Sequence, residues 1–255
     1  VVNPIFEETF IPTSFSCRIG YGVHRGIRQL KKMAQSVSRN NTRSCFALKC
    51  DIRKFFDNID HKILFSIIRK RISDKETLWL LEEIVESFGT NPGPLFPKKG
   101  LPIGNLTSQL FANVYMNEFD QFVKQELKVK DYLRYTDDFM VLSPDRSYLE
   151  QLLPQLEAFL NDKLVLQLHP KKVTIRRLTQ GVDFLGYVTF PQHRLLRSKT
   201  QKRVFVKSNR RLQEYRSGKI SQGTLEGSLN SYLGVFSHAN AYELSEKLKN
   251  NFWLK

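Results

Sequence analysis

Two short apolar segments around a pair of adjacent acids constrain the fold more than any other feature of this chain. Residues 132–135 and 139–142 are rich in β-prone side chains, and Thr136, Asp137 and Asp138 lie between them. The pattern predicts an antiparallel hairpin with both acids at its tip, and the apolar arms indicate that the sheet beside the tip is buried. For the acid pair taken alone, a solvated turn held by Asx hydrogen bonds is the alternative.

A third acid, Asp51, ends residues 44–51, a short and mostly apolar segment that predicts a buried strand. If this strand is a neighbour of the hairpin, carboxylates meet at one end of the sheet, where their repulsion is costly unless cations neutralise it. Two divalent ions about 3.5–4 Å apart would neutralise it and would align an in-line displacement at phosphorus. Mg²⁺ prefers such all-oxygen sites, so the acids predict a magnesium centre for phosphoryl chemistry.

The balance of charge predicts a polyanionic partner. The 255 residues include 40 Lys and Arg against 25 Asp and Glu, which gives a net charge of +15. Residues 167–219 alone hold 14 basic side chains and two acidic ones. A solvated basic face is the alternative, but Phe205 and Tyr215 lie among the concentrated cations, which favours nucleic-acid binding.

The cysteine and hydropathy patterns exclude other classes. Three cysteines, an odd number without metal-like spacing, argue against a disulfide framework and a zinc module. No segment approaches the roughly 18 consecutive apolar residues of a membrane span, and the first residues show no signal-peptide pattern. We therefore expect a cytoplasmic protein that has no membrane partner.

Strand and helix patterns occur without regular alternation, which predicts the α+β class. Glycines and prolines make residues 1–45 loop-rich apart from a helix near 23–35, and Asp60 is expected to cap a helix. The other expected helices cover residues 59–72, 74–88, 106–126, 148–160, 199–216, 221–234 and 238–251, and further strands cover 164–168, 173–175 and 182–190.

Five motifs occur in a fixed order along the chain. They are DIRKFFD at 51–57, LPIGNLTSQ at 101–109, YTDD at 135–138, LHPKK at 168–172 and FLGY at 184–187. Together they resemble the motifs of bacterial reverse transcriptases, specifically the group similar to diversity-generating retroelements and, more distantly, group II introns. The resemblance implies an RNA-directed DNA polymerase with a right-hand fold. Its parts would be partial fingers (1–46), a palm with an antiparallel sheet and flanking helices (47–192) and a small helical thumb (193–255).

The resemblance also implies a catalytic centre. Asp51 and Asp137 would bridge two Mg²⁺ ions, with Mn²⁺ as a substitute, and Asp138 and the backbone carbonyl of Ile52 would complete the metal site. Lys172 would protonate the leaving pyrophosphate. For that role Lys171 is an alternative, and a phosphate or surface contact is the simpler interpretation of Lys172.

Substrate selection is implied by two motifs. Phe56 would lie under the sugar and exclude a 2′-hydroxyl, unless it is a plain core residue. Ile103, Gly104 and Gln109 would lie near the nascent base pair, where most relatives have Gln-Gly and then Ser-Pro. The aliphatic residue and the Gln are similar to the diversity-generating group and imply relaxed fidelity. Defence-associated and group II intron enzymes are the alternatives.

Contacts with primer and template are implied for a further set of residues. The primer grip would be formed by a turn, or else this segment is a buried strand without contacts. The residues are Phe184, Leu185, Gly186 and Tyr187 for the primer grip, Arg18 in the fingers, and Arg203, Lys207, Arg210 and Arg211 in the thumb, which would follow the duplex by charge.

The implied partners are an RNA template, a DNA or RNA primer, dNTPs and a basic accessory protein. The chain starts without Met and without the basic fingers segment of the family, so we expect the grip on the triphosphate to lie in that segment. It ends without an endonuclease domain, as expected for a minimal retroelement enzyme. An inert RNA-binding relative, or an unrelated basic RNA-binding domain, is the competing hypothesis. The first would have no reason to keep three acids in a polyanion-binding cleft, and the second leaves the ordered motifs unexplained.

Overall fold

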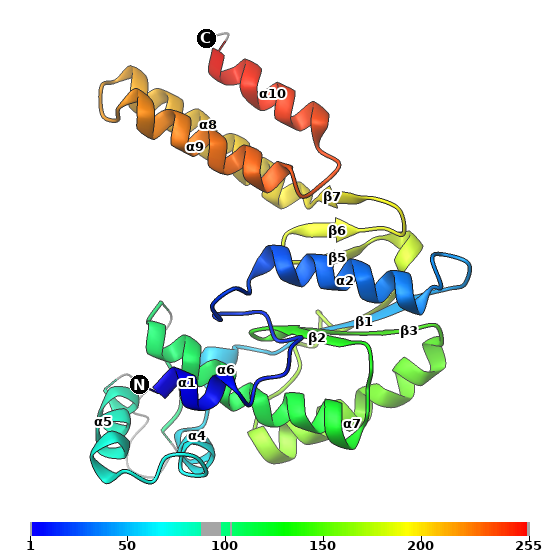
Figure 1. The fold of residues 1–255 in the computed structure, drawn as a ribbon, viewed down its shortest axis with the longest axis vertical. Helices are drawn as coiled ribbons and strands as arrows, with labels where there is room; N and C mark the ends of the chain where they lie inside the picture. The colour runs from blue at the N-terminus through cyan, green and yellow to red at the C-terminus, as the bar shows by residue number, and fades with distance from the viewer. Residues whose placement is uncertain (1, 88–97, 103, 254–255) are drawn as a thin grey trace. The chain divides into compact units, whose positions relative to one another are not determined.

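The computed structural model describes residues 2–87, 98–102 and 104–253, and it divides the chain into two compact units, residues 1–176 and 177–255. Helices and antiparallel strands are mixed in both units (Figure 1), which confirms the predicted α+β class. The three-part division into fingers, palm and thumb remains a prediction. None of the described helices is long and apolar enough to cross a membrane.

A four-stranded sheet organises the first unit. Its strands lie in the order β2 (Tyr132–Tyr135), β3 (Asp138–Ser143), β1 (Phe46–Asp51) and β4 (Thr174–Arg177), and β3 is antiparallel to both β2 and β1. Helix α2 (Val23–Val37) covers one face of this sheet, and α6 (Leu106–Gln121) and α7 (Arg146–Leu164) cover the other (Figure 1). Because both faces are covered, five consecutive residues of β3 are buried.

Polar side chains cap four helices of this unit. Asp60 accepts hydrogen bonds from two N–H groups of the first turn of α4 (His61–Ile68), which confirms the predicted cap. Asp74, Asn105 and Asp145 cap α5 (Lys75–Glu86), α6 and α7 in the same way. Two short helices, α1 (Val2–Glu7) and α3 (Phe55–Asn58), and a π-helical segment η1 (Phe122–Glu126) complete the unit. The core between sheet and helices includes Phe119, Phe139, Leu156 and Leu160.

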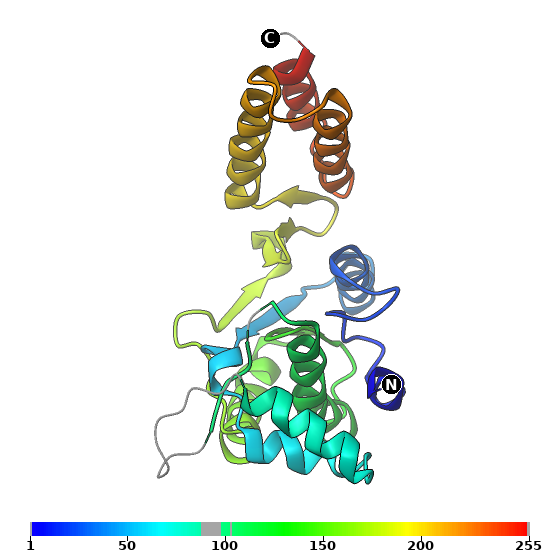
Figure 2. The same ribbon diagram turned by 90° about the vertical axis from the view of Figure 1, so that its left-hand side faces the viewer.

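The second unit combines a small sheet with three helices. Strands β5 (Val182–Phe184), β6 (Tyr187–Thr189) and β7 (Arg194–Leu196) form an antiparallel meander after a 3₁₀ turn, η2 (Leu178–Gln180). Helices α8 (Ser198–Arg216), α9 (Gln222–Phe236) and α10 (Tyr242–Trp253) then pack against one another (Figure 2). Their buried side chains include Val204, Leu225, Leu229 and Phe236.

Several local predictions are wrong. Residues 164–168 are not a strand, because α7 continues to Leu164 and Val165 takes a left-handed conformation (φ 51°). The strand predicted at 182–190 is two strands, because Leu185 and Gly186 both have positive φ and reverse the chain. The helix predicted at 59–72 ends at Ile68, and α1 and β7 were not predicted. The predicted end of a helix at residue 88 lies outside the described residues.

All three cysteines are free thiols. Cys45 and Cys50 are buried at or beside β1, whereas Cys17 is exposed. The Sγ of Cys17 lies 3.1 Å from the Oγ of its buried neighbour Ser16.

Candidate active site

Three aspartates meet at one end of the first unit's sheet. Asp51, the last residue of β1, lies opposite Asp138, the first residue of β3, in the antiparallel register. Directly opposite residues project from the same face of a sheet. Asp137 lies in the turn between β2 and β3, where its carbonyl accepts a hydrogen bond of 3.3 Å from the N–H of Ile52. The backbone thus brings the three predicted acids together, with Asp137 in the turn and Asp138 already in the strand.

Burial and mutual repulsion disfavour the charged forms of these acids. Burial, with the charges of Asp51 and Asp138 beside it, raises the pKa of Asp137 from the ordinary 3.8 to about 6. Burial also raises the pKa of Asp138, although Lys49 Nζ lies 3.6 Å from its Oδ2. The other oxygen of Asp138, Oδ1, is buried and has no hydrogen-bond partner among the described residues. Without a bound cation, the protonated forms of Asp137 and Asp138 are therefore favoured. A bound cation would stabilise the ionised carboxylates instead.

Lys172 provides one cation from the chain itself. Its Nζ donates hydrogen bonds to both carboxylate oxygens of Asp51, each at 2.9 Å. Its segment is tied to the end of β1, because the N–H of His169 donates to the Asp51 carbonyl at 2.8 Å and Leu168 forms a bridge with Ile52. The Lys172 side chain is 54% exposed, against 15% for Asp51, so the pair lies at the surface of the site.

The turn that carries Asp137 has an unfavourable backbone conformation. Thr136 has φ 56°, which is rare for a β-branched residue. Its Oγ1 donates to Ser16 Oγ at 2.6 Å, and its carbonyl accepts from the Arg134 guanidinium at 2.9 Å. The turn is therefore held by Ser16, from a segment 120 positions earlier, and by Arg134 of the adjoining strand β2.

The two motifs predicted to select the nucleotide lie against each other through their backbones. The carbonyl of Phe56 accepts a hydrogen bond of 2.8 Å from the N–H of Leu101. Phe56 is half-buried and meets Phe55 edge to face, with the ring centroids 5.4 Å apart. Gly104 is exposed with φ 98°, and Gln109 lies in the first turn of α6. Ile103 lies outside the described residues.

Arg18 is engaged within the fold. Its side chain is 5% exposed and forms an ion pair of 2.7 Å with Glu7. The same guanidinium donates to the carbonyls of Ile11 and Ser14 and lies over the ring of Tyr21, 4.0 Å from its centroid. These contacts favour a structural role for Arg18 over the predicted contact with primer or template.

The predicted primer grip lies in the second unit. Phe184 and Tyr187 are buried there, and the hydroxyl of Tyr187 donates to the carbonyl of Val235 at 3.0 Å. Leu185 and Gly186 form the partly exposed turn between β5 and β6. Of the motif, this turn is therefore the part that is open to a ligand.

The four predicted thumb cations all lie on α8. Arg203, Lys207 and Arg210 are exposed, and Arg211 is half-buried. Arg210 and Arg211 both pair with Glu214, at 3.3 and 3.0 Å. Glu214 therefore offsets part of the positive charge that these four residues contribute to α8.

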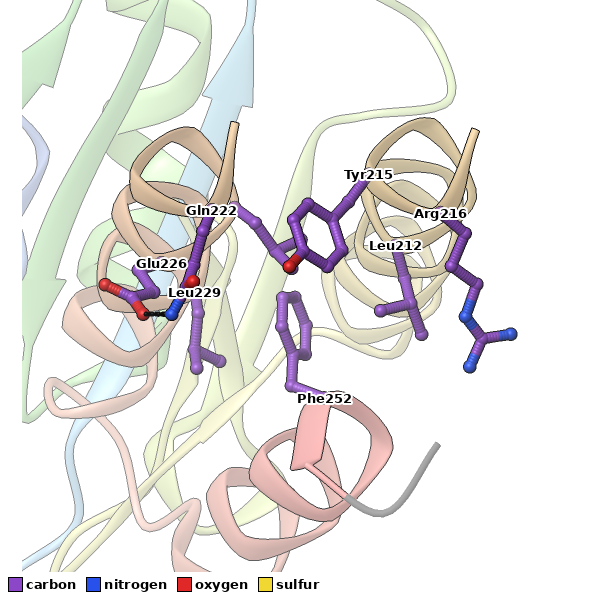
Figure 3. Close-up of a pocket in the computed structure, with 8 residues that line it drawn as sticks. Leu212, Tyr215, Arg216, Gln222, Glu226, Leu229 and Phe252 are labelled. Carbon is purple, nitrogen blue, oxygen red and sulfur yellow. Dashed lines mark hydrogen bonds between the residues drawn. The ribbon is translucent and has the colours of Figure 1, made fainter. Parts of the chain in front are cut away.

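A cavity of about 250 Å³ lies between the three helices of the second unit. Figure 3 shows the rings of Tyr215 and Phe252 directed into the space between the helices, with Gln222 and Glu226 joined by a hydrogen bond of 2.8 Å at one side. Its lining is mainly apolar, and none of the predicted site residues contributes to it.

The residues at the sheet end fit a divalent cation in their chemistry. Across the described ranges, no group of three or more His, Cys, Asp or Glu side chains lies in an arrangement that could hold a metal ion. The three carboxylates nevertheless offer only hard oxygen donors, and one of them, Asp138, has a buried oxygen without a partner. Such donors suit Mg²⁺ or Mn²⁺ better than softer metals.

Sequence reasoning missed the side chains that support the acids. Lys49 could have been found, because it lies two positions before Asp51 and strand alternation places both on one face. Arg134 and Asp120 gave a weaker signal, a single charge within an apolar strand or helix. Their pairing joins elements that the sequence does not relate.

An antiparallel sheet covered by helices on both faces, with acids where its central strands β1 and β3 meet, is consistent with the palm of a nucleic-acid polymerase. The family model described as "Reverse transcriptase (RNA-dependent DNA polymerase)" matches residues 9–189. This chain belongs to the reverse transcriptase family.

Curated relatives agree with this assignment. Protein YkfC of Escherichia coli strain K12 is 27% identical, over 78% of this chain and 59% of its own length. The group II intron-encoded protein LtrA of Lactococcus lactis subsp. cremoris is 23% identical, over 99% of this chain and 49% of its own length. The chain thus spans about half to three-fifths of the length of these relatives, and one of the proteins that it is similar to is encoded by a bacterial group II intron.

Solved structures share the fold. The apo telomerase of Candida tropicalis matches 97% of this chain and 50% of its own, with a TM-score of 0.62 and 11% identity. The telomerase of Candida albicans in complex with a fragment of telomeric RNA matches 98% and 45%, with a TM-score of 0.61 and 13% identity. At such identities the likeness concerns the fold alone, and it agrees with the predicted right-hand polymerase architecture.

Proposed function

We propose that this protein is an RNA-directed DNA polymerase whose centre is the sheet end formed by Asp51, Asp137 and Asp138. The observation that carries the proposal is the register of β1 with β3, which sets Asp51 opposite Asp138 in a chain of the reverse transcriptase family. An inert RNA-binding relative would gain nothing from this repulsive cluster, because its charge opposes that of the nucleic acid.

In the proposed reaction, the 3′-hydroxyl of a primer loses its proton to solvent and its oxygen bonds to the α-phosphorus of a dNTP, while the bond from that phosphorus to pyrophosphate breaks. Asp51 and Asp137, with Asp138 and the Ile52 carbonyl beside them, would hold two Mg²⁺ ions, for which Mn²⁺ could substitute. Ions held there would favour the ionised 3′-hydroxyl and would neutralise charge on the leaving group. Lys172, whose Nζ already lies 2.9 Å from Asp51, would donate a proton to the leaving pyrophosphate.

The substrate would be chosen by shape. The ring of Phe56 would exclude the 2′-hydroxyl of a ribonucleotide, and its backbone bond to Leu101 would keep it beside the segment that holds Ile103, Gly104 and Gln109. The exposed face of α8 and the turn at Leu185 and Gly186 would contact primer and template by charge and shape.

The finer assignment concerns the biological type. The relatives support a bacterial, group II intron-like retroelement enzyme. Within that group, Ile103-Gly104 and Ser108-Gln109 favour the diversity-generating type, with relaxed fidelity, a basic accessory protein as partner and the cytoplasm as location.

Primer extension on an RNA template with dNTPs and Mg²⁺ tests this function. Wild type should make DNA, and Asp137→Ala should not, while both bind the template. Asp162→Asn, at an exposed position of α7, is the matched control for the loss of one acid. Equal synthesis by wild type and Asp137→Ala would overturn the proposal, as would RNA binding without synthesis by wild type in the presence of its accessory factors. Errors concentrated at template adenines would support the diversity-generating type.

A further inference from the structure

Directly behind the Asp137 turn lies an ion pair that is buried completely. Arg134 of β2 and Asp120 of α6 are each 0% exposed, and two hydrogen bonds of 2.8 and 2.6 Å join the guanidinium to the carboxylate. The Tyr132 hydroxyl donates a further bond of 2.6 Å to the same carboxylate. Well-packed apolar side chains often stabilise a core as well as a buried ion pair does, or better. This pair therefore points to a role of its hydrogen bonds other than stability.

The remaining donors of Arg134 reach three other residues. Nη2 donates to Ser14 Oγ at 3.0 Å, and Nη1 donates to Asn113 Oδ1 at 3.3 Å. Nη1 also donates to the carbonyl of Thr136 at 2.9 Å. The guanidinium has five N–H groups, and it makes five hydrogen bonds within the fold.

The contact with Thr136 is where this network meets the candidate active site. Thr136 has φ 56° and precedes Asp137, so relaxation of Thr136 to an ordinary conformation would turn the Asp137 side chain away. A second hold on Thr136 comes from Ser16, which is itself fixed because its carbonyl accepts from Asn113 Nδ2 at 2.8 Å. Both contacts with Thr136 therefore depend on the same buried polar cluster, which contains Arg134, Asp120 and Asn113.

We propose that Arg134, with Asp120 as its counterion, is a positioning residue that fixes the Thr136 carbonyl and thereby directs Asp137 toward Asp51 for metal binding. The catalytic consequence of this positioning rests on the proposed function. The positioning itself is measured by the affinity of the three acids for a divalent cation. Arg134 touches neither substrate nor metal in this account. Its effect passes through the backbone of Thr136.

The test compares variants of the full chain by their affinity for Mn²⁺, measured by calorimetry without substrate. The double variant Arg134→Met/Asp120→Leu removes both charges and leaves no buried charge unpaired. We expect it to fold and bind RNA like wild type, but to bind Mn²⁺ at least tenfold more weakly. Lys70→Met/Glu118→Gln removes an exposed ion pair at α6 and should bind Mn²⁺ like wild type.

Two further variants separate positioning from general packing. Arg134→Lys keeps the charge but lacks the planar fork that reaches Asp120 and Thr136 at once, so it should also weaken Mn²⁺ binding, and it answers the question if the double variant does not fold. Adding Thr136→Gly to the double variant should restore part of the affinity, because glycine adopts φ 56° without strain.

The outcomes distinguish this inference from the polymerase proposal. Wild-type affinity for Mn²⁺ in a folded Arg134→Lys or double variant would overturn the positioning role, whatever its polymerase activity. Absence of DNA synthesis by wild type would refute the proposed function and would leave the Mn²⁺ comparison valid.

Discussion

Replacement of Asp137 by Asn is expected to stabilise the protein in the absence of metal while it abolishes DNA synthesis. In the folded protein, burial and the charges of Asp51 and Asp138 oppose the ionised form of Asp137, and Lys172 offsets them only in part. An Asn side chain has nearly the same shape and no charge to bury. The variant therefore removes a cost of folding that the wild-type protein bears.

The size of the effect follows from the pKa of Asp137, which rises from 3.8 to about 6. A shift of about 2 units corresponds to about 3 kcal/mol at neutral pH, which is an upper limit because the side chain is only partly buried. We therefore expect Asp137→Asn to raise the free energy of unfolding by about 1–3 kcal/mol.

The dependence on pH has a definite sign. Because folding raises the pKa of Asp137, its neutral form is stabilised, and this contribution is complete below the unfolded value of 3.8 and is lost as the pH rises through about 6. The advantage of Asp137→Asn should thus be full above pH 7 and should fade toward pH 4.

Urea unfolding with a chelator present, at several pH values, measures this difference. Added Mg²⁺ should reverse the order of stability, because it stabilises wild type more than the variant. A variant that is less stable than wild type at neutral pH, or a difference that is the same at every pH, would refute the reasoning.

Three further predictions concern selectivity, binding and stability. Phe56→Val should raise ribonucleotide use relative to deoxyribonucleotide use by roughly 10- to 100-fold in single-nucleotide extension, and an unchanged ratio would mean that Phe56 serves the core alone. Replacing the four predicted thumb cations of α8 (Arg203, Lys207, Arg210 and Arg211) by Ala should reduce the slope of log affinity for RNA against log salt by about 2–4. The lower end of this range is expected because Glu214 already pairs with Arg210 and Arg211, and a slope equal to that of wild type would place the nucleic acid elsewhere. Asp60→Ala should lower the free energy of unfolding by about 1 kcal/mol in urea titrations, because two N–H groups of α4 lose their acceptor, and no change would show that water replaces the cap.

The central features of the fold were predictable because their signals are local. Short apolar, β-prone segments located the hairpin and β1, and the capping residue Asp60 marked the start of α4. The acids could be grouped because each lies at the end of a strand of the same sheet or in the turn beside it. Turn chemistry was harder, since the reversal at Leu185 depends on a residue that rarely adopts positive φ.

The supporting network was beyond sequence reasoning for a different reason. Ser14 and Thr13 contact Arg134 across about half the length of the chain, and Asn113 joins them from a third segment. No local pattern encodes such a meeting, because it depends on how α6 and the first residues pack onto β2. Arg18 shows the converse, since a basic residue that suggested nucleic acid is engaged by Glu7 instead.

The exposure of Cys17 makes the protein selectively addressable by thiol chemistry. Burial raises the pKa of Cys45 to about 12 and also raises that of Cys50, so neither offers a thiolate to reagents at neutral pH. A maleimide dye would therefore attach at Cys17. Its neighbour Ser16 accepts the hydrogen bond from Thr136 in the turn that carries Asp137. The emission of the dye would give a direct optical signal of whether that turn is formed, independent of any catalytic turnover.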